Sequence, residues 1–241
     1  MMVADINMYQ FTRHDSAQAM VKDLAEALAL TLDKAISQRG EAAFAVSGGS
    51  SPKPLYEALS KTDLNWSRVK VVLVDERWVN RGEPGSNADF IAATLLRDKA
   101  AKAHFIPLKS DAPSPHEGLD EVEARLDGLH WPLDVAVLGM GPDGHTASWF
   151  PDAVGLDNAL YGAKRLAAVS AHKSEVTGEH VERITLTRRA LDQCGLTLLM
   201  LQGAAKREAF EIACGPGEIA EMPVRALLRD PDFDLHTHWA P

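Results

Sequence analysis

Residues 42–59 read AAFAVSGGSSPKPLYEAL, and they contain both kinds of segment from which we expect the fold to be built. The first five residues form a short apolar run that stops at a cluster of glycine and serine, as a buried strand does. Pro52 suits the first turn of a helix because its fixed φ is already helical, and we expect that helix to continue through Leu59. A strand that passes into a helix through a glycine-rich loop is typical of α/β proteins.

The same alternation of apolar runs and helical segments extends along most of the chain. The long first helix has apolar residues three and four positions apart, begins at Ser16 and ends at Gly40. Further strands are predicted at residues 70–74, 104–108, 134–138, 165–170, 182–187 and 196–201, and further helices at 86–96, 117–129 and after 203. We therefore predict a Rossmann-like α/β fold, a mostly parallel sheet with helices on both faces, and a single domain over residues 1–241. The last twenty residues show no pattern that predicts an element.

Composition and charge limit the classes of function. Hydrophobic residues make up 46% and charged residues 24% of the 241 residues, a balance typical of globular proteins. The net charge of -9 argues against nucleic-acid binding, which needs a basic face. No stretch approaches the roughly 18 uninterrupted apolar residues of a membrane helix, and residues 1–12 lack the apolar run of a signal peptide. We therefore expect a cytoplasmic protein without nucleic-acid or membrane partners.

Three loops with unusual chemistry follow predicted strands, at residues 47–51, 75–77 and 139–145. Because ligands bind at the carboxyl ends of parallel strands, we expect the three loops to share one rim of the sheet. In the first loop, Gly48 and Gly49 let backbone N–H groups approach an anion, and the hydroxyl of Ser50 can donate as well. A tight turn with a good helix cap explains the same residues equally well. The loop is not a Walker A motif, since no Gly-Lys-Ser/Thr follows.

The third loop, GMGPDGHTAS at residues 139–148, contains a formal GxGxxG pattern. A dinucleotide site is disfavoured because the loop contains Pro142 and Asp143, and no acidic residue follows about twenty positions later to hold a ribose. The alternative is a turn that places the imidazole of His145 beside the carboxylate of Asp143. Histidine suits a general base, because its ordinary pKa of about 6.5 leaves it largely neutral near pH 7.

Extended to residue 151, this segment reads GMGPDGHTASWFP and resembles the signature of the 6-phosphogluconolactonase family, whose common form ends in HTASLFP. Further matches follow in family order, namely SGGSSPKPLY at 47–56, VDERWV at 74–79, SN at 86–87, RITLT at 183–187 and GxxK at 203–206. The resemblance spans residues 16–210 and weakens at 177–181, where TGEHV replaces a proline-rich stretch. It implies a fold similar to that of glucosamine-6-phosphate deaminases and ribose-5-phosphate isomerases.

The resemblance also implies hydrolysis of 6-phosphogluconolactone in the oxidative pentose phosphate pathway, without a cofactor or catalytic metal. The catalytic candidates are the family's general base, its neighbour in the DGH motif and the rim carboxylate of VDER: His145, Asp143 and Asp75. The candidates for binding the phosphate and the other substrate oxygens are a loop and three cations: Gly48, Gly49, Ser50, Arg77, Arg183 and Lys206. A δ-lactone is a reactive ester, so one positioned base and oxyanion stabilisation, by backbone amides or by Arg77, should suffice.

Other functions remain to be separated from this one. Deaminases of the same fold continue after DGH with an IAFNEP-like stretch whose glutamate supports ring opening, whereas residues 146–151 contain no carboxylate. A non-enzymatic sugar-phosphate sensor would carry a DNA-binding segment, for which we expect no room before Ser16. A dinucleotide oxidoreductase is the third alternative. A metal site at His236 and His238 is disfavoured, because this pair supplies no third ligand at a set spacing.

Overall fold

The structure is a computed structural model that describes residues 10–241; residues 1–9, which belong to the segment searched for a signal peptide, lie outside the described residues. The strands are β1 (Phe11–Arg13), β2 (Ala42–Val46), β3 (Val69–Leu73), β4 (Asp75–Arg77), β5 (His104–Ile106), β6 (Val135–Leu138), β7 (Leu166–Ser170), β8 (Glu182–Leu186), β9 (Leu196–Gln202) and β10 (Leu235–Ala240). The α-helices are α1 (Ala17–Arg39), α2 (Lys53–Leu59), α3 (Asn87–Thr94), α4 (Pro115–Arg125), α5 (Leu156–Tyr161), α6 (Arg188–Leu191), α7 (Ala204–Cys214) and α8 (Arg225–Leu228). Short 3₁₀ turns lie at η2 (Trp66–Arg68), η3 (Asp98–Lys102) and η4 (Leu126–Gly128).

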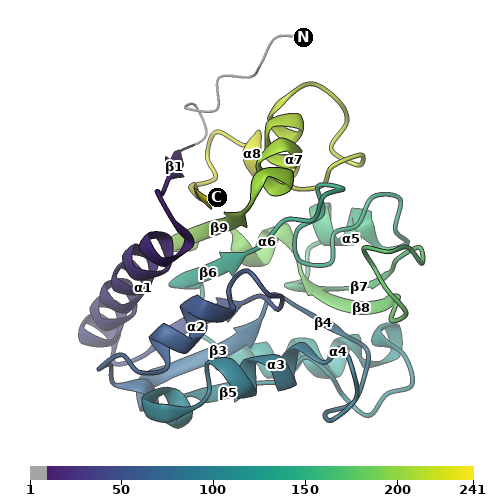
Figure 1. Cartoon of the computed structure of the whole chain (residues 1–241). Helices are drawn as coiled ribbons and strands as arrows, with labels where there is room; N and C mark the ends of the chain where they lie inside the picture. The colour runs from purple at the N-terminus through teal and green to yellow at the C-terminus, as the bar shows by residue number, and fades with distance from the viewer. Residues whose placement is uncertain (1–9) are drawn as a thin grey trace.

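Within residues 10–241, seven strands form a parallel sheet in the order β1-β10-β9-β6-β2-β3-β5 (Figure 1). The predicted α/β fold with a mostly parallel sheet is confirmed. The central strands β2 and β6 are buried at every residue, which explains their apolar sequences. The chain proceeds outward from β2 to β3 and β5, and then returns to the other side of β2 to form β6. The strand order therefore reverses between β2 and β6, the place where sheets of this kind bind ligands.

A smaller antiparallel sheet lies beside the first, with the order β4-β8-β7. The predicted strands at 165–170 and 182–187 form this sheet with each other and do not extend the parallel one. The expectation of a loop at residues 75–77 is wrong, because these residues form β4. Val74 makes the turn between the sheets, since its N–H donates to the carbonyl of Val46 on β2 while its own carbonyl accepts from the N–H of Leu186 on β8.

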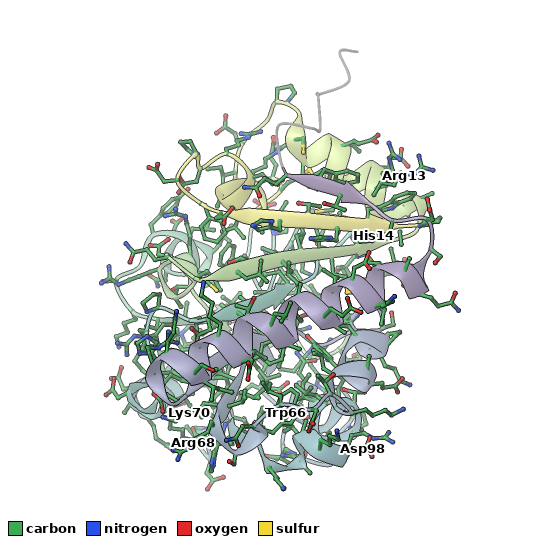
Figure 2. All side chains as sticks on the ribbon, turned by 90° about the vertical axis from the view of Figure 1, so that its left-hand side faces the viewer. Arg13, His14, Trp66, Arg68, Lys70 and Asp98 are labelled. Carbon is green, nitrogen blue, oxygen red and sulfur yellow. The ribbon has the colours of Figure 1, made fainter. Side chains whose placement is uncertain are left out.

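Helix α1 crosses one face of the parallel sheet and packs against α2, β2 and β10 (Figures 1 and 2). It begins and ends where the sequence predicts. The Oγ of Ser16 accepts a hydrogen bond from the N–H of Ala19, and Gly40, at φ 84°, donates its N–H to the carbonyl of Ile36. Its buried residues follow the predicted spacing: Met20, Leu24, Leu28 and Leu32. Among the described residues, no helix combines the length and apolar character needed to cross a membrane.

The C-terminal segment, for which the sequence predicted no element, contains β10 between β1 and β9. Polar residues obscure this strand in the sequence, although Leu235, Thr237 and Trp239 alternate as its buried positions. Its His238 places Nδ1 3.0 Å from Nε2 of His14, which Figure 2 labels beside this edge of the sheet. Burial, together with the nearby His14, lowers the pKa of His238 to about 4, so this histidine is neutral at pH 7.

Candidate active site

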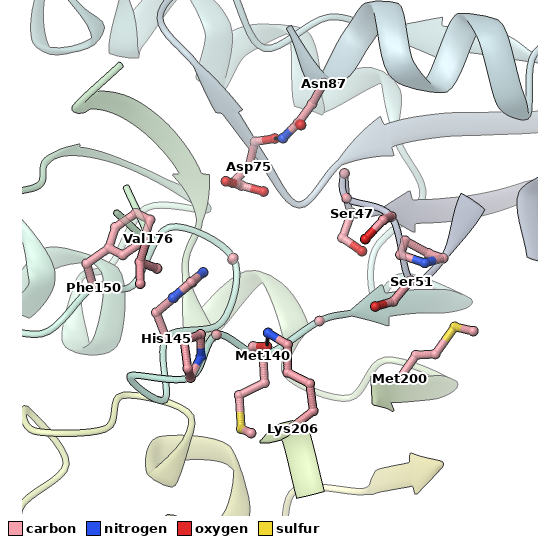
Figure 3. Close-up of a pocket in the computed structure, with 18 of the residues that line it drawn as sticks. Ser47, Ser51, Asp75, Asn87, Met140, His145, Phe150, Val176, Met200 and Lys206 are labelled. Atoms are coloured by element: carbon pink, nitrogen blue, oxygen red, sulfur yellow. Dashed lines mark hydrogen bonds between the residues drawn. The ribbon is translucent and has the colours of Figure 1, made fainter. Parts of the chain in front are cut away.

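A pocket with a volume of about 460 Å³ lies where the strand order reverses, at the carboxyl ends of β2 and β6 (Figure 3). The three segments that we expected on one rim all contribute to it. Among the residues proposed from the sequence, those that line the pocket are Gly48, Gly49, Ser50, Asp75, Arg77, His145, Arg183 and Lys206. Asp143 does not line the pocket itself, but its carboxylate contacts the ring of His145.

The turn after β6 holds His145 in a fixed orientation. Oδ1 of Asp143 lies 2.6 Å from Nδ1 of His145 and also accepts a hydrogen bond from the backbone N–H of His145, at 3.2 Å. Gly141 is required beneath this pair, because a Cβ at that position would lie 2.1 Å from Nδ1 and 2.4 Å from Oδ1. Since Asp143 engages Nδ1, the imidazole is set with its proton on Nδ1 and with Nε2 as the basic nitrogen.

Packing and electrostatics stabilise this arrangement. The ring of Phe150 packs against that of His145 with a centroid distance of 4.4 Å. Burial acts to raise the pKa of Asp143, but its hydrogen bond and charge interaction with His145 outweigh burial, and the net effect is a lowered pKa. Asp143 is therefore ionised at neutral pH, which keeps the imidazole oriented and stabilises its protonated form.

The loop after β2 is held by hydrogen bonds to Tyr56, and the side chain of Asn87 packs against it. The buried hydroxyl of Tyr56 accepts from the N–H of Ser47 and donates to the carbonyl of Ser47, both at 3.0 Å. A Cβ on Gly48 would lie 2.0 Å from Oδ1 of Asn87, so a larger residue fits there only if the side chain of Asn87 moves. Gly49 has a φ of 105°, which favours glycine for conformational reasons. The loop is thus held with its backbone against the pocket.

The antiparallel sheet supplies the opposite wall. Asp75 is buried, and its Oδ2 accepts a hydrogen bond of 2.6 Å from Oγ of Ser148, which follows the histidine turn. The same Oδ2 lies 4.0 Å from Nη1 of Arg183 on β8. The hydroxyl of Thr185 accepts from the N–H of Ser148 at 3.2 Å, so the histidine segment and this sheet are tied together at two points.

Arg183 is anchored by the stretch in which the sequence departs from the family pattern. Its Nε donates to the carbonyl of His180 and its Nη2 to the carbonyl of Thr177, both at 2.7 Å. The segment TGEHV therefore supplies backbone acceptors that need no proline. Burial lowers the pKa of Arg183 to about 10, with Asp75 acting in the opposite direction, so the guanidinium remains charged at neutral pH.

Two more cations reach the pocket. Nη1 of Arg77 donates to the carbonyl of Gly85, and Nζ of Lys206, in the first turn of α7, donates to the carbonyl of Met140. Burial lowers the pKa of Lys206, while the charge of Asp143 opposes that shift. Within residues 10–241, Nε of Arg77 and Oγ of Ser47 are buried without a hydrogen-bond partner. Both belong to pocket-lining residues, and polar atoms of this kind are suited to meet a polar ligand.

Comparison with known proteins shows the family to which the chain belongs. The profile of the family described as "Glucosamine-6-phosphate isomerases/6-phosphogluconolactonase" matches residues 15–239. A 6-phosphogluconolactonase of Rhizobium meliloti (strain 1021) is 40% identical over 235 residues, which are 98% of this chain and 99% of that protein. The chain belongs to this family.

Solved structures place it among the 6-phosphogluconolactonases in fold as well. The crystal structure of a 6-phosphogluconolactonase from Shewanella baltica OS155 superposes with a TM-score of 0.90 at 35% identity, covering 96% of this chain and 97% of that one. A monomeric glucosamine-6-phosphate deaminase superposes with a TM-score of 0.75 at 16% identity, covering 96% of each chain. At that identity, the second likeness concerns the fold alone.

Several residues in the pocket or directly behind its wall in this 6-phosphogluconolactonase family member were not singled out from the sequence. Ser148 and Asn87 lie within the matched motifs, but nothing in their spacing indicates that one binds Asp75 and the other fills the space beside Gly48. Ser47 lies in the loop whose serine hydroxyls the sequence suggests as donors to phosphate. Glu175 and Val176 come immediately before the divergent segment at 177–181 and carried no signal. Among residues 10–241, no three His, Cys, Asp or Glu side chains are grouped so as to hold a metal ion.

Proposed function

We propose that this chain hydrolyses 6-phosphogluconolactone to 6-phosphogluconate, with His145 as the general base. The observation that carries the mechanism is the 2.6 Å contact between Nδ1 of His145 and Oδ1 of Asp143 on the wall of a pocket rich in cations. That contact leaves Nε2 to accept a proton from water. The family supports the reaction, and the geometry supports the assignment of the base.

The reaction begins when water attacks the lactone carbonyl carbon while Nε2 of His145 takes one of its protons. The carbonyl oxygen then becomes an oxyanion, for which backbone N–H groups of the glycine loops and the guanidinium of Arg77 are the candidate donors. Collapse of the tetrahedral intermediate breaks the bond to the ring oxygen, which takes the proton back from the imidazolium. The ring oxygen stays tethered to the product, and the histidine returns to its neutral form.

Substrate binding depends on local charge and not on the net charge of the chain. We assign Gly48, Gly49 and Ser50, together with Lys206 and Arg183, to the phosphate and neighbouring oxygens, since these groups lie around one pocket. Asp75 keeps its second carboxylate oxygen for a substrate hydroxyl or for the attacking water, because Ser148 and Arg183 engage Oδ2.

A deaminase or isomerase reaction is the second candidate, and Phe150 argues against it. When the deaminase stretch IAFNEP is set beside TASWFP, its glutamate falls at Phe150, whose ring packs against His145. The side chain of phenylalanine can neither donate nor accept the protons that opening of the sugar ring requires. The same ring shields one face of the imidazole from water, which suits a site that needs a single base.

A coupled assay tests the proposal. Freshly generated 6-phosphogluconolactone is supplied, its spontaneous hydrolysis is subtracted, and formation of 6-phosphogluconate is followed. Release of ammonia from glucosamine 6-phosphate is measured in parallel. We expect lactone hydrolysis well above the spontaneous rate and no ammonia. Ammonia release without lactone hydrolysis would assign the chain to the deaminase branch of the family.

The cellular setting is also part of the proposal. The substrate is a small sugar phosphate of the oxidative pentose phosphate pathway, so we place the protein in the cytoplasm. We assign it no nucleic-acid or membrane partner, in keeping with the net charge of -9. Fractionation of cells with an antibody against the chain tests the location directly.

A further inference from the structure

Glu76 is the buried residue between two pocket residues, Asp75 and Arg77, on β4. It is only 1% exposed. Successive side chains of a strand point to opposite faces, so Glu76 points away from the pocket while its two neighbours line it. A carboxylate in such a place needs hydrogen-bond donors, because burying an unpaired charge is strongly unfavourable.

Most of the donors lie at the start of α3. Oε1 of Glu76 accepts from the N–H of Asn87 and from that of Arg77 on its own strand, and Oε2 accepts from the N–H of Ala88, all at 2.8 Å. The hydroxyl of Ser86 donates to Oε2 at 3.5 Å. The carboxylate therefore caps α3 from a separate strand and fixes the distance between β4 and the helix. It uses groups that would otherwise lack partners at a helix N-terminus.

The first residue of that helix reaches the pocket. Nδ2 of Asn87 donates to the backbone carbonyl of Asp75 at 3.0 Å, and its Oδ1 fills the space beside Gly48. Any movement of α3 relative to β4 would thus shift the glycine loop, Asp75 and Arg77 together. Glu76 lies at the point where these three parts of the site are joined.

We propose that the ionised carboxylate of Glu76 is a positioning group for the reaction, because it holds α3 against β4 and thereby sets Asp75, Arg77 and the Gly48 loop around the substrate. Glu76 does not touch the substrate. This inference rests on the proposed lactone hydrolysis. It assigns to the glutamate of the VDER motif a role distinct from those of its two neighbours.

The arrangement should respond to pH. Burial raises the pKa of Glu76 to about 6, against the effect of its three backbone donors and with a small contribution from Asp75. Arg183 on β8 also interacts electrostatically with Glu76, and the other charged residues on the elements that meet here are Arg77 on β4 and Asp89 in the first turn of α3. Below this pKa the carboxyl gains a hydrogen and loses its negative charge, so its hydrogen bonds to the backbone N–H groups are no longer charge-assisted and become weaker. The contact between α3 and β4 should therefore change as the pH falls through this value, even though the raised pKa means that the folded protein binds this proton more tightly than the unfolded chain does.

The test compares Glu76→Gln with the wild type between about pH 5 and pH 8. The amide copies the protonated glutamic acid, so kcat/KM at the upper end should fall about 10- to 100-fold through mispositioning. The ratio of the wild-type kcat/KM to that of the variant should then fall toward one below about pH 6, where Glu76 of the wild type is itself protonated. A pH dependence that is common to both proteins cancels in this ratio.

Glu123→Gln is the matched control. Its carboxylate also accepts from two backbone N–H groups, those of Arg165 and Leu166, both at 2.9 Å, but it does not line the pocket. That variant should keep its activity at every pH, measured on protein whose folded fraction is known from circular dichroism. Glu76→Asp retains a charge and should lose less activity than Glu76→Gln at the upper end.

If the ratio of wild-type kcat/KM to that of Glu76→Gln stays constant with pH, the proposal is overturned, since a merely structural role gives that result. If Glu76→Gln does not fold, the ratio of wild type to Glu76→Asp is decisive, and it too must shrink toward low pH. Absence of lactone hydrolysis in the wild type is a different outcome, because it contradicts the proposed function and not the role of Glu76.

Discussion

The two walls of the pocket differ in how exposed their charged side chains are. The turn wall, residues 139–145 after β6, carries His145 and Asp143 with side chains that are 20% and 30% exposed. The sheet wall, formed by β4 and β8, carries Asp75 and Arg183 with side chains that are only 10% and 4% exposed. A base that exchanges protons with water needs access to it, whereas a fixed charge acts more strongly when water is excluded.

The difference points to a division of labour between the walls. On the turn wall, a contact between residues two positions apart orients the imidazole, and a glycine makes room for it. On the sheet wall, contacts between distant segments hold charges at fixed positions, as Ser148 holds Asp75. We therefore expect changes on the turn wall to affect the chemical step, and changes on the sheet wall to affect substrate binding and placement.

The largest effect is expected at the base. His145→Ala should lower kcat by roughly 10²- to 10⁴-fold while KM changes little, because it removes proton transfer and leaves the binding groups in place. Steady-state kinetics with the lactone measure both constants. His116→Ala, at an exposed histidine on α4, is the control. A folded His145→Ala protein with near-normal kcat would remove this residue from the mechanism.

A smaller effect, chiefly in KM, is expected for the cations. Lys206→Met or Arg183→Met should each remove a charge-assisted contact of about 1.5–3 kcal/mol, which is roughly a 10- to 150-fold rise in KM. The rise should be much smaller for unphosphorylated gluconolactone, which offers no phosphate to bind. Lys164→Met, at an exposed ion pair with Asp120, is the control. Equal losses on both lactones would show that these cations do not bind the phosphate.

The two walls also differ in how far the sequence predicts them. The turn wall could be predicted because its key contact is local, and a glycine-rich turn after an apolar run shows where it lies. For the sheet wall, the sequence indicated Asp75, Arg77 and Arg183 through motif resemblance alone. The contact between Asp75 and Ser148 joins residues 73 positions apart, and no periodicity reveals such a pair.

In the fold as well, the sequence predicts local features better than contacts between distant segments. Strands buried on both faces, such as β2, β3 and β6, are visible as apolar runs, and the parallel sheet follows from their alternation with helices. The strands β1, β4 and β10 were missed because β1 and β4 have only three residues each, those of β4 being all charged, and because β10 contains polar residues. The pairing of β4 and β10 depends on β8 and β9, which are distant in sequence from β4 and β10 respectively, so tertiary contacts decide it.

Ser148 allows the sheet wall to be disturbed without removing a charge. Ser148→Ala deletes the hydrogen bond to Asp75 and should lower kcat/KM about 3- to 10-fold, less than a lost charge because Arg183 still faces the carboxylate. The control is Ser170→Ala, which deletes a hydrogen bond of 3.0 Å to Glu182 outside the pocket. If the two variants behave alike, the contact between Ser148 and Asp75 has no special part in catalysis.

The smallest expected effect is that of a chelator, for which we predict none. Metal hydrolases hold their ion with about three protein ligands, so a metal shared by His145, Asp143 and Asp75 would join the two walls and end their division of labour. The positions of these groups disfavour such a role, because Asp143 engages Nδ1 of His145 and Ser148 donates to Asp75. The lactone carbonyl is already activated and its leaving oxygen stays tethered, so a base and an oxyanion donor are sufficient. Activity should persist after exhaustive EDTA treatment, with the metal requirement of the coupling enzyme supplied separately. Activity that is lost on chelation and restored by one particular divalent ion would replace the base-catalysed mechanism with a metal-assisted one that spans both walls.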